Sequence, residues 1–162
     1  MSMFEDDQYC WRETYFVLFD SARRPSLKAV QDVLGRLGGR LTLVNGVAGE
    51  AGEFESITVL APDDFAAVDI SYLAGEEVRE QGTNLAREME QSGDAEGRKD
   101  QLARLRRYDG RFDVLHFEQL VGNDEEDDPD GMLDPTTLLS VLETLARLTD
   151  GIAVDPQAGT VL

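Results

Sequence analysis

SLKAVQDVLGRLGGRLTLV, residues 26–44, is the stretch around which the chain is organised. Apolar residues recur in its first half at spacings of three and four, which is typical of a helix with one apolar face. These residues are Leu27, Val30, Leu34 and Leu37. A Gly-Gly pair follows as a helix stop, and the apolar run Leu41–Val44 is typical of a buried strand. The stretch therefore predicts a helix that packs against a sheet.

A second copy of this plan occurs at residues 137–155, TLLSVLETLARLTDGIAVD. Under a constant offset, Leu27, Val30, Leu34, Arg36 and Leu37 fall on Leu138, Val141, Leu145, Arg147 and Leu148. Each copy belongs to a block with the order strand, helix, strand, strand, so an internal repeat of 13–61 and 112–162 is one interpretation. The other is that two amphipathic helices, each ended by glycine and followed by a strand, share this spacing by chance.

Turn and breaker residues divide the rest of the chain into further strands and helices. Strands are expected at 13–20, 41–44, 54–61, 68–72, 112–119, 152–155 and 160–162. Helices are expected at 26–37, 74–90, 99–108 and 135–149, although Gly82 costs the second helix about 1 kcal/mol. The pattern predicts a single α+β domain spanning 1–162. Its sheet is antiparallel or mixed and its helices lie mainly on one face, as in a variant of the ferredoxin-like arrangement.

The expected strands differ in how many faces they bury. Residues 13–20 and 112–119 are apolar on both alternating sets, which is typical of central strands covered on both sides. In the strand at 68–72, Asp69 and Ser71 make one face polar. This strand is expected at a sheet edge or on an open face, and the face that carries Asp69 and Ser71 is a candidate for binding a partner with a basic surface.

The charge balance is the most unusual feature of the composition. Of 162 residues, 33 are acidic and 15 are basic, which gives a formal net charge of −18. This charge repels nucleic acid and anionic membranes and favours a partner protein with a basic surface. Cys10 is the only cysteine, so the fold needs no disulfide, and no signal peptide or membrane span is visible. A cytoplasmic location is expected.

An acidic segment, NDEEDDPDG at 123–131, is a candidate for binding a cation or a partner. The partner candidates are four consecutive carboxylates: Glu125, Glu126, Asp127 and Asp128. A calcium loop aligned on Gly131 would need a glutamate where the chain has Thr137, so no metal site is assigned. A solvated loop is the structural alternative. The segment 98–111 is basic by contrast, and the two segments could dock on each other or on a partner.

His116 is the only histidine and shares a strand face with Glu118 by the period of two. A buried histidine beside a carboxylate can act as an acid or base near neutral pH, whereas a structural histidine satisfied by hydrogen bonds is the alternative. Asp69 and Tyr72 are a second pair of polar groups that a pocket could use. Cys10 is either inert or a nucleophile, and the sequence shows no partner that would activate it.

Familiar catalytic and cofactor motifs are absent from the sequence. It contains no G-x-x-x-x-G-K-[ST] and no G-x-S-x-G, and one histidine with one cysteine cannot form the usual zinc site. No cofactor is expected. The sequence favours a non-enzymatic protein-binding or regulatory module. Two alternatives stay open: a small-ligand-binding protein or enzyme with a pocket between the repeated blocks, and a homodimer formed through an uncovered sheet face.

Overall fold

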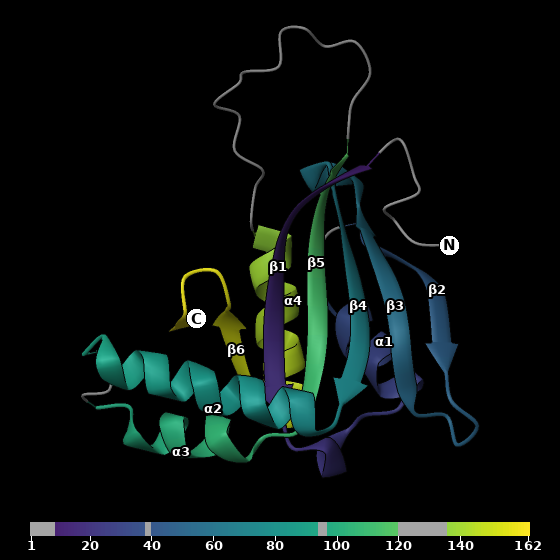
Figure 1. Ribbon diagram of the computed structural model, residues 1–162. Helices are drawn as coiled ribbons and strands as arrows, with labels where there is room; N and C mark the ends of the chain where they lie inside the picture. The colour runs from purple at the N-terminus through teal and green to yellow at the C-terminus, as the bar shows by residue number, and fades with distance from the viewer. Residues whose placement is uncertain (1–8, 38–39, 94–96, 120–135) are drawn as a thin grey trace, which may run out of the picture.

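A computed structural model of the chain describes residues 9–37, 40–93, 97–119 and 136–162. Its centre is an antiparallel sheet of seven strands in the order β2-β3-β4-β5-β1-β6-β7 (Figure 1). The strands are β1 (Tyr9–Phe19), β2 (Thr42–Ala48), β3 (Phe54–Ala61), β4 (Ala66–Ala74), β5 (Gly110–Gln119), β6 (Ile152–Asp155) and β7 (Thr160–Val161). All neighbouring strands pair antiparallel. The sequence allowed an antiparallel or a mixed sheet, and the sheet is antiparallel.

Helices cover both faces of this sheet (Figure 1). The helices are α1 (Leu27–Gly35), α2 (Glu76–Gln91), α3 (Lys99–Arg107) and α4 (Thr136–Thr149), with the short 3-10 helices η2 (Ser21–Arg23) and η3 (Pro62–Asp64). α1 and α4 lie on one face, and α2 and α3 lie on the other. The prediction that the helices lie mainly on one face is therefore wrong. No helix among the described residues is long and apolar enough to cross a membrane.

β1 explains why both faces need a helix layer. Val17 and Phe19 pack with α1 and α4, whereas Leu18 points the other way and packs with α2, α3 and β6. All three side chains are fully buried. The side chains that cover Leu18 from the helices are Val78, Leu85, Ala86 and Met89 of α2 with Leu102 and Leu105 of α3.

The elements expected from the sequence are present in the described residues, although β1 begins four residues earlier and β2 ends four residues later than expected. The glycine stop at 38–39 and the Asp-Pro start at 134–135 lie outside the described residues. β4 lies between β3 and β5, so the half-polar strand is internal and not at an edge. Its Asp69 and Ser71 alternate with Val68 and Ile70, which pack toward α1 and α4, and therefore lie on the opposite face.

The two repeated blocks occupy different kinds of place in the sheet. β1 and β5, which begin the blocks, are antiparallel neighbours, and α1 and α4 pack against each other on one face. Of the strands that follow α1, β2 lies at the sheet edge and β3 lies inside it. Of those that follow α4, β6 lies inside and β7 lies at the edge. After its helix, the first block thus continues from the edge of the sheet inward, whereas the second block continues from the inside to the edge.

Gly82 lies in the middle of α2 because α2 and α3 approach closely there. A Cβ atom at Gly82 would lie 2.2 Å from the backbone carbonyl oxygen of Leu105 in α3. This distance is far inside van der Waals contact. The glycine that lowers the helix propensity of α2 is therefore the residue that lets α3 pack against it.

Gly82→Ala should destabilise the protein by about 1–2 kcal/mol, because moving the α3 backbone costs more than the gain in helix propensity. Denaturant unfolding measures the change. The control is Gly35→Ala at the end of α1, where the added Cβ would meet nothing within 4 Å. The control should leave stability unchanged or raise it by up to about 1 kcal/mol. Equal changes in the two variants would contradict the close contact.

Candidate functional site

His116 is buried on β5 and contacts a carboxylate of the neighbouring strand. Its side chain is 2% exposed, and Nδ1 lies 3.2 Å from Oε1 of Glu13 on β1. Glu118 forms an ion pair with Arg12 at 3.4 Å. Neither the His116 nor the Glu118 side chain lines the cavity under α2 or either of the two cavities beside the end of α3. This arrangement favours the structural interpretation of His116.

Asp69 and Tyr72 point to opposite faces of β4, so the structure does not bring this pair together. Oδ1 of Asp69 accepts a hydrogen bond from Oγ1 of Thr58 on β3 at 2.5 Å, and Ser71 lies on the same face as Asp69. Tyr72 packs on the α1 side, where the Arg24 guanidinium lies 4.0 Å from its ring centroid. Burial raises the pKa of the Tyr72 hydroxyl there.

The other sequence candidates are the acidic segment and Cys10. Glu125, Glu126, Asp127 and Asp128 lie outside the described residues. Cys10 is exposed, and its Sγ lies 3.6 Å from the carbonyl oxygen of Trp11. Within the described residues, no group of three or more histidine, cysteine, aspartate or glutamate side chains could hold a metal ion.

A first cavity, which we call the acidic hollow, lies between α2 and the sheet and has a volume of about 390 Å³. Apolar side chains form part of its wall: Phe16, Leu18, Leu85, Val154 and Pro156. Its polar lining consists of Glu77, Glu80, Gln81, Asn84 and Glu88 of α2 with Arg111 of β5. The cavity thus combines an apolar wall with several carboxylates.

Three glutamates of α2 line the acidic hollow without a basic partner. Glu77, Glu80 and Glu88 are exposed and form no ion pair or side-chain hydrogen bond with the rest of the described chain. Their spacing of three and eight residues places them on one side of the helix. Glu77 also lies in the first turn of α2, where a carboxylate stabilises the helix dipole. A structural role therefore accounts for Glu77 but not for the other two.

Arg111 links β5 to α2 beside these glutamates. Its side chain is 14% exposed, Nε lies 2.5 Å from Oδ1 of Asp113, and Nη1 donates a hydrogen bond to Oε1 of Gln81. The guanidinium carbon lies 4.3 Å from the centroid of the Phe16 ring. Because Asp113 already matches its charge, Arg111 does not neutralise the glutamates of the acidic hollow.

A second cavity, which we call the arginine hollow, has a volume of about 230 Å³. It lies where η2, the end of α3 and the end of α4 meet, and its lining consists of Asp20, Arg23, Arg104, Arg107, Tyr108 and Asp150. Arg23 and Arg107 are exposed and form no side-chain hydrogen bond or ion pair within the ranges that the structure describes. Three arginines and two aspartates line the hollow, so its lining has an excess of one positive charge.

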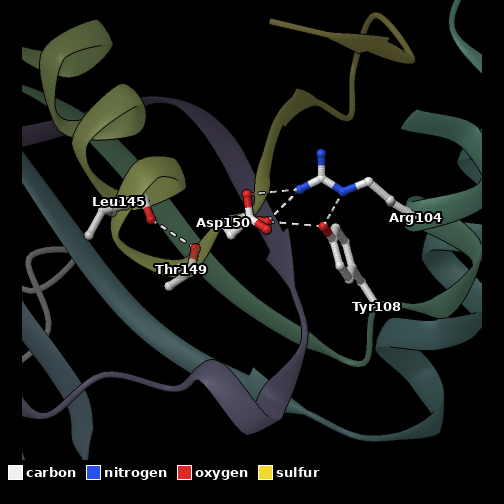
Figure 2. Close-up of polar contacts among 5 residues, drawn as sticks. All are labelled: Arg104, Tyr108, Leu145, Thr149 and Asp150. Carbon is white, nitrogen blue, oxygen red and sulfur yellow. Dashed lines mark hydrogen bonds and ion pairs between the residues drawn. The ribbon is translucent and has the colours of Figure 1, made fainter. Parts of the chain in front are cut away.

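Arg104 and Tyr108 are fixed against the C-terminal end of α4 (Figure 2). Nη2 of Arg104 donates to the carbonyl oxygen of Asp150 at 2.6 Å and lies 3.4 Å from Oδ1 of the same residue. The Tyr108 hydroxyl donates to that carbonyl oxygen at 3.0 Å and accepts a hydrogen bond from Nε of Arg104 at 2.7 Å. Asp150 ends α4 in the left-handed region, at a φ of 52°, while Oγ1 of Thr149 donates to the Leu145 carbonyl at 2.8 Å.

A third cavity, which we call the apolar groove, adjoins the arginine hollow and shares Arg104 and Asp150 with it. Its volume is about 490 Å³, and it lies between α3, α4 and the β6–β7 edge of the sheet. Leu139 and Leu162 line it and are 49% and 54% exposed. The two cavities therefore meet at the Arg104–Asp150 ion pair.

Asp109 holds η2, and with it Arg23, beside the end of α3. Its Oδ1 accepts a hydrogen bond from the backbone amide of Ser21 and its Oδ2 accepts one from the Ser21 hydroxyl, both at 2.9 Å. The amide hydrogen bond above all lowers the pKa of the Asp109 carboxyl below its usual range. This stabilisation is present above the ordinary pKa of aspartate and is lost as the pH falls through the lowered value.

Asp109→Asn should lower the free energy of unfolding by about 1 kcal/mol at neutral pH, because a charged acceptor is lost at a partly exposed site. The difference from the wild type should shrink below about pH 4 and vanish once Asp109 is protonated in the wild type. Urea unfolding over this pH range measures it. Asp32→Asn, at an exposed position of α1, makes the same change in charge. The same pH-dependent difference in both variants would contradict the role of the Ser21 contacts.

Comparisons of the chain with protein-family models, with curated proteins and with solved structures found no match. The function must therefore be argued from the geometry of the cavities. Of the residues that line them, Glu80, Glu88 and Arg23 were not predicted from the sequence, whereas Arg104 and Arg107 lie in the basic segment 98–111. That basic segment could be seen in the sequence, but which of its arginines form ion pairs depends on elements that are distant in the chain.

Proposed function

We propose that this protein is a cytoplasmic, non-enzymatic binding module that accepts a basic side chain of a partner protein in the acidic hollow. One observation carries the proposal. Glu77, Glu80 and Glu88 line a cavity with an apolar wall and have no basic partner in the part of the chain that the structure describes. An arginine or lysine side chain matches both features, because its stem is apolar and its head is charged.

The contrast with the other glutamates of α2 supports this proposal. Glu76 and Glu90 form ion pairs with Arg79 at 3.5 Å and with Arg106 at 2.6 Å. The carboxylates at the acidic hollow repel one another without such a partner, and a cation bound between them would relieve that repulsion. The glutamates of α2 that form no ion pair with the described residues therefore all line the cavity.

The size and charge of the site favour arginine as the inserted side chain. A cavity of about 390 Å³ has room for a single long side chain, and Phe16 and Leu85 offer apolar contact to its stem. A guanidinium group can donate two parallel hydrogen bonds to a carboxylate, which an ammonium group cannot. The formal net charge of −18 would accelerate encounter with a basic partner and make the association rate dependent on salt.

Neutralising Glu80 and Glu88 should weaken the binding of a basic peptide by about tenfold, which corresponds to about 1.4 kcal/mol. The probe is a fluorescein-labelled hexa-arginine peptide, and fluorescence anisotropy measures its affinity at about 0.15 M ionic strength, where long-range attraction is screened. The variant is Glu80→Gln/Glu88→Gln. The control is Glu50→Gln/Glu55→Gln, which changes the net charge equally, from −18 to −16, at exposed positions outside α2. The control should bind within about twofold of the wild type.

Equal losses in these two variants would show that the peptide follows net charge alone, and they would overturn the acidic hollow as the site. A third variant, E125Q/E126Q/D127N/D128N, tests the acidic segment as the alternative site for a basic partner. Loss of binding in this variant alone would move the function to that segment.

We also propose that residues 13–61 and 112–162 are an internal repeat within a variant of the ferredoxin-like arrangement. The adjacent β1 and β5 and the packing of α1 against α4 support it, whereas the placement of the last two strands of each block differs. Residues of both blocks line the acidic hollow, with Phe16 and Leu18 from the first and Val154 and Pro156 from the second. The arginine hollow likewise joins Asp20 and Arg23 to Asp150. A ligand pocket between the blocks therefore stays open as an alternative.

Self-association is a second candidate function, favoured by exposed apolar side chains on the sheet. Trp11, Val47 and Leu73 are 40%, 44% and 40% exposed, and in Figure 1 α2 and α3 cover only the lower part of their face of the sheet. A homodimer that covers these side chains should scatter light with twice the chain mass of 17.9 kDa. A measured mass of one chain at about 0.1 mM would remove this candidate.

A further inference from the structure

We infer that the arginine hollow binds the phosphate group of a small phosphomonoester whose organic part lies in the adjoining apolar groove. This site is separate from the acidic hollow and does not depend on the function proposed for it. A volume of about 230 Å³ has room for a tetrahedral phosphate with ordered water.

The arginine hollow carries more positive charge than its own carboxylates neutralise. Arg104 is paired with Asp150, and Asp20 caps η2, where its Oδ1 accepts a backbone amide at 3.0 Å. Arg23 and Arg107 have no partner among the described residues, although the chain contains 33 acidic side chains. Three guanidinium groups and two carboxylates line the cavity, so its lining is net positive, and guanidinium groups can donate paired hydrogen bonds to the oxygens of a phosphate.

The way in which the two arginines are brought together distinguishes them from solvated surface charges. Arg23 belongs to η2, which follows β1, and Arg107 ends α3 more than half the chain later. The hydrogen bonds from Ser21 to Asp109 tie these two segments together. This contact holds Arg23 and Arg107 at one cavity, where a bound anion would reduce the repulsion between them.

Arg104 adds a third, fixed cation to the same cavity. Its Nε and Nη2 are engaged by the Tyr108 hydroxyl and the Asp150 carbonyl, and its side chain is 25% exposed. Tyr108 is 7% exposed and acts as a positioning residue, because both of its hydrogen bonds are used within the protein. A guanidinium that is already ordered loses little side-chain entropy when the ligand binds.

The apolar groove determines which kind of group is attached to the phosphate. It begins at Arg104 and Asp150 and is lined beyond them by apolar residues that include Leu139, Leu142 and Ile152, together with the polar side chains of Gln101, Glu143 and Arg147. Its volume of about 490 Å³ lies within the range of small-molecule sites. An aryl or alkyl phosphate therefore uses both cavities, whereas inorganic phosphate uses only the arginine hollow.

Isothermal titration calorimetry near pH 7.5 with inorganic phosphate and with phenyl phosphate tests the inference. Both should bind, phenyl phosphate about tenfold more tightly because its ring is buried in the groove. Arg23→Gln and Arg107→Gln should each weaken both ligands by about tenfold. Arg36→Gln removes the same charge at an exposed site after α1 and should stay within about twofold of the wild type.

Further arms of the experiment separate the two cavities and the two ligand chemistries. Leu139→Ala should weaken phenyl phosphate and leave inorganic phosphate unchanged, and Glu80→Gln/Glu88→Gln should affect neither. Benzoate should bind at least about tenfold more weakly than phenyl phosphate, because it offers one negative charge in place of two. The inference is overturned by equal binding of benzoate, by equal losses in Arg36→Gln and Arg107→Gln, or by the absence of saturable binding up to about 10 mM.

Discussion

Both helix layers depend on one constraint, which is that β1 must be buried on its two sides. Val17 and Phe19 are covered by α1 and α4, and Leu18 is covered by α2 and α3. Burial of one such side chain contributes about 1.5–3 kcal/mol, so neither face of the strand can be left in water without a large loss of stability. The α2–α3 layer that meets this need also forms the candidate sites, because the acidic hollow lies under α2 and the arginine hollow lies at the end of α3.

The secondary structure could be read from the sequence because apolar residues follow the helix or strand period in nearly every element. The side of the sheet on which α2 and α3 lie could not be read in this way. The apolar stripe of α2 shows that the helix packs on something, and only the apolar residues on both faces of 13–20 indicate where a second layer is needed. Gly82 shows the same limit, since its cost to the helix is local but its reason is a contact with Leu105.

The candidate sites were less predictable, because a charged residue can bind a ligand only where the fold leaves it without a partner. The basic segment 98–111 was recognised in the sequence. Arg106 and Arg111 form ion pairs, however, whereas Arg107 forms none with the described residues. His116 was a reasonable candidate on residue type alone. Its contact with Glu13 joins residues that are 103 positions apart, and no local pattern contains that information. Which charged side chains are paired can therefore be learned only from the tertiary structure.

The position of β1 in the sheet also bears on how the chain folds as it is synthesised. β1 is made first, but its neighbours are β5 and β6, with Phe19 opposite Gly110 and Phe16 opposite Val154. Until those strands have left the ribosome, β1 is an apolar strand with two unpaired edges. Such non-local pairing slows folding and prolongs the time during which a chaperone or another nascent chain can bind the strand. β1 can therefore pair only after β2, β3 and β4 have been made, first with β5 and then with β6.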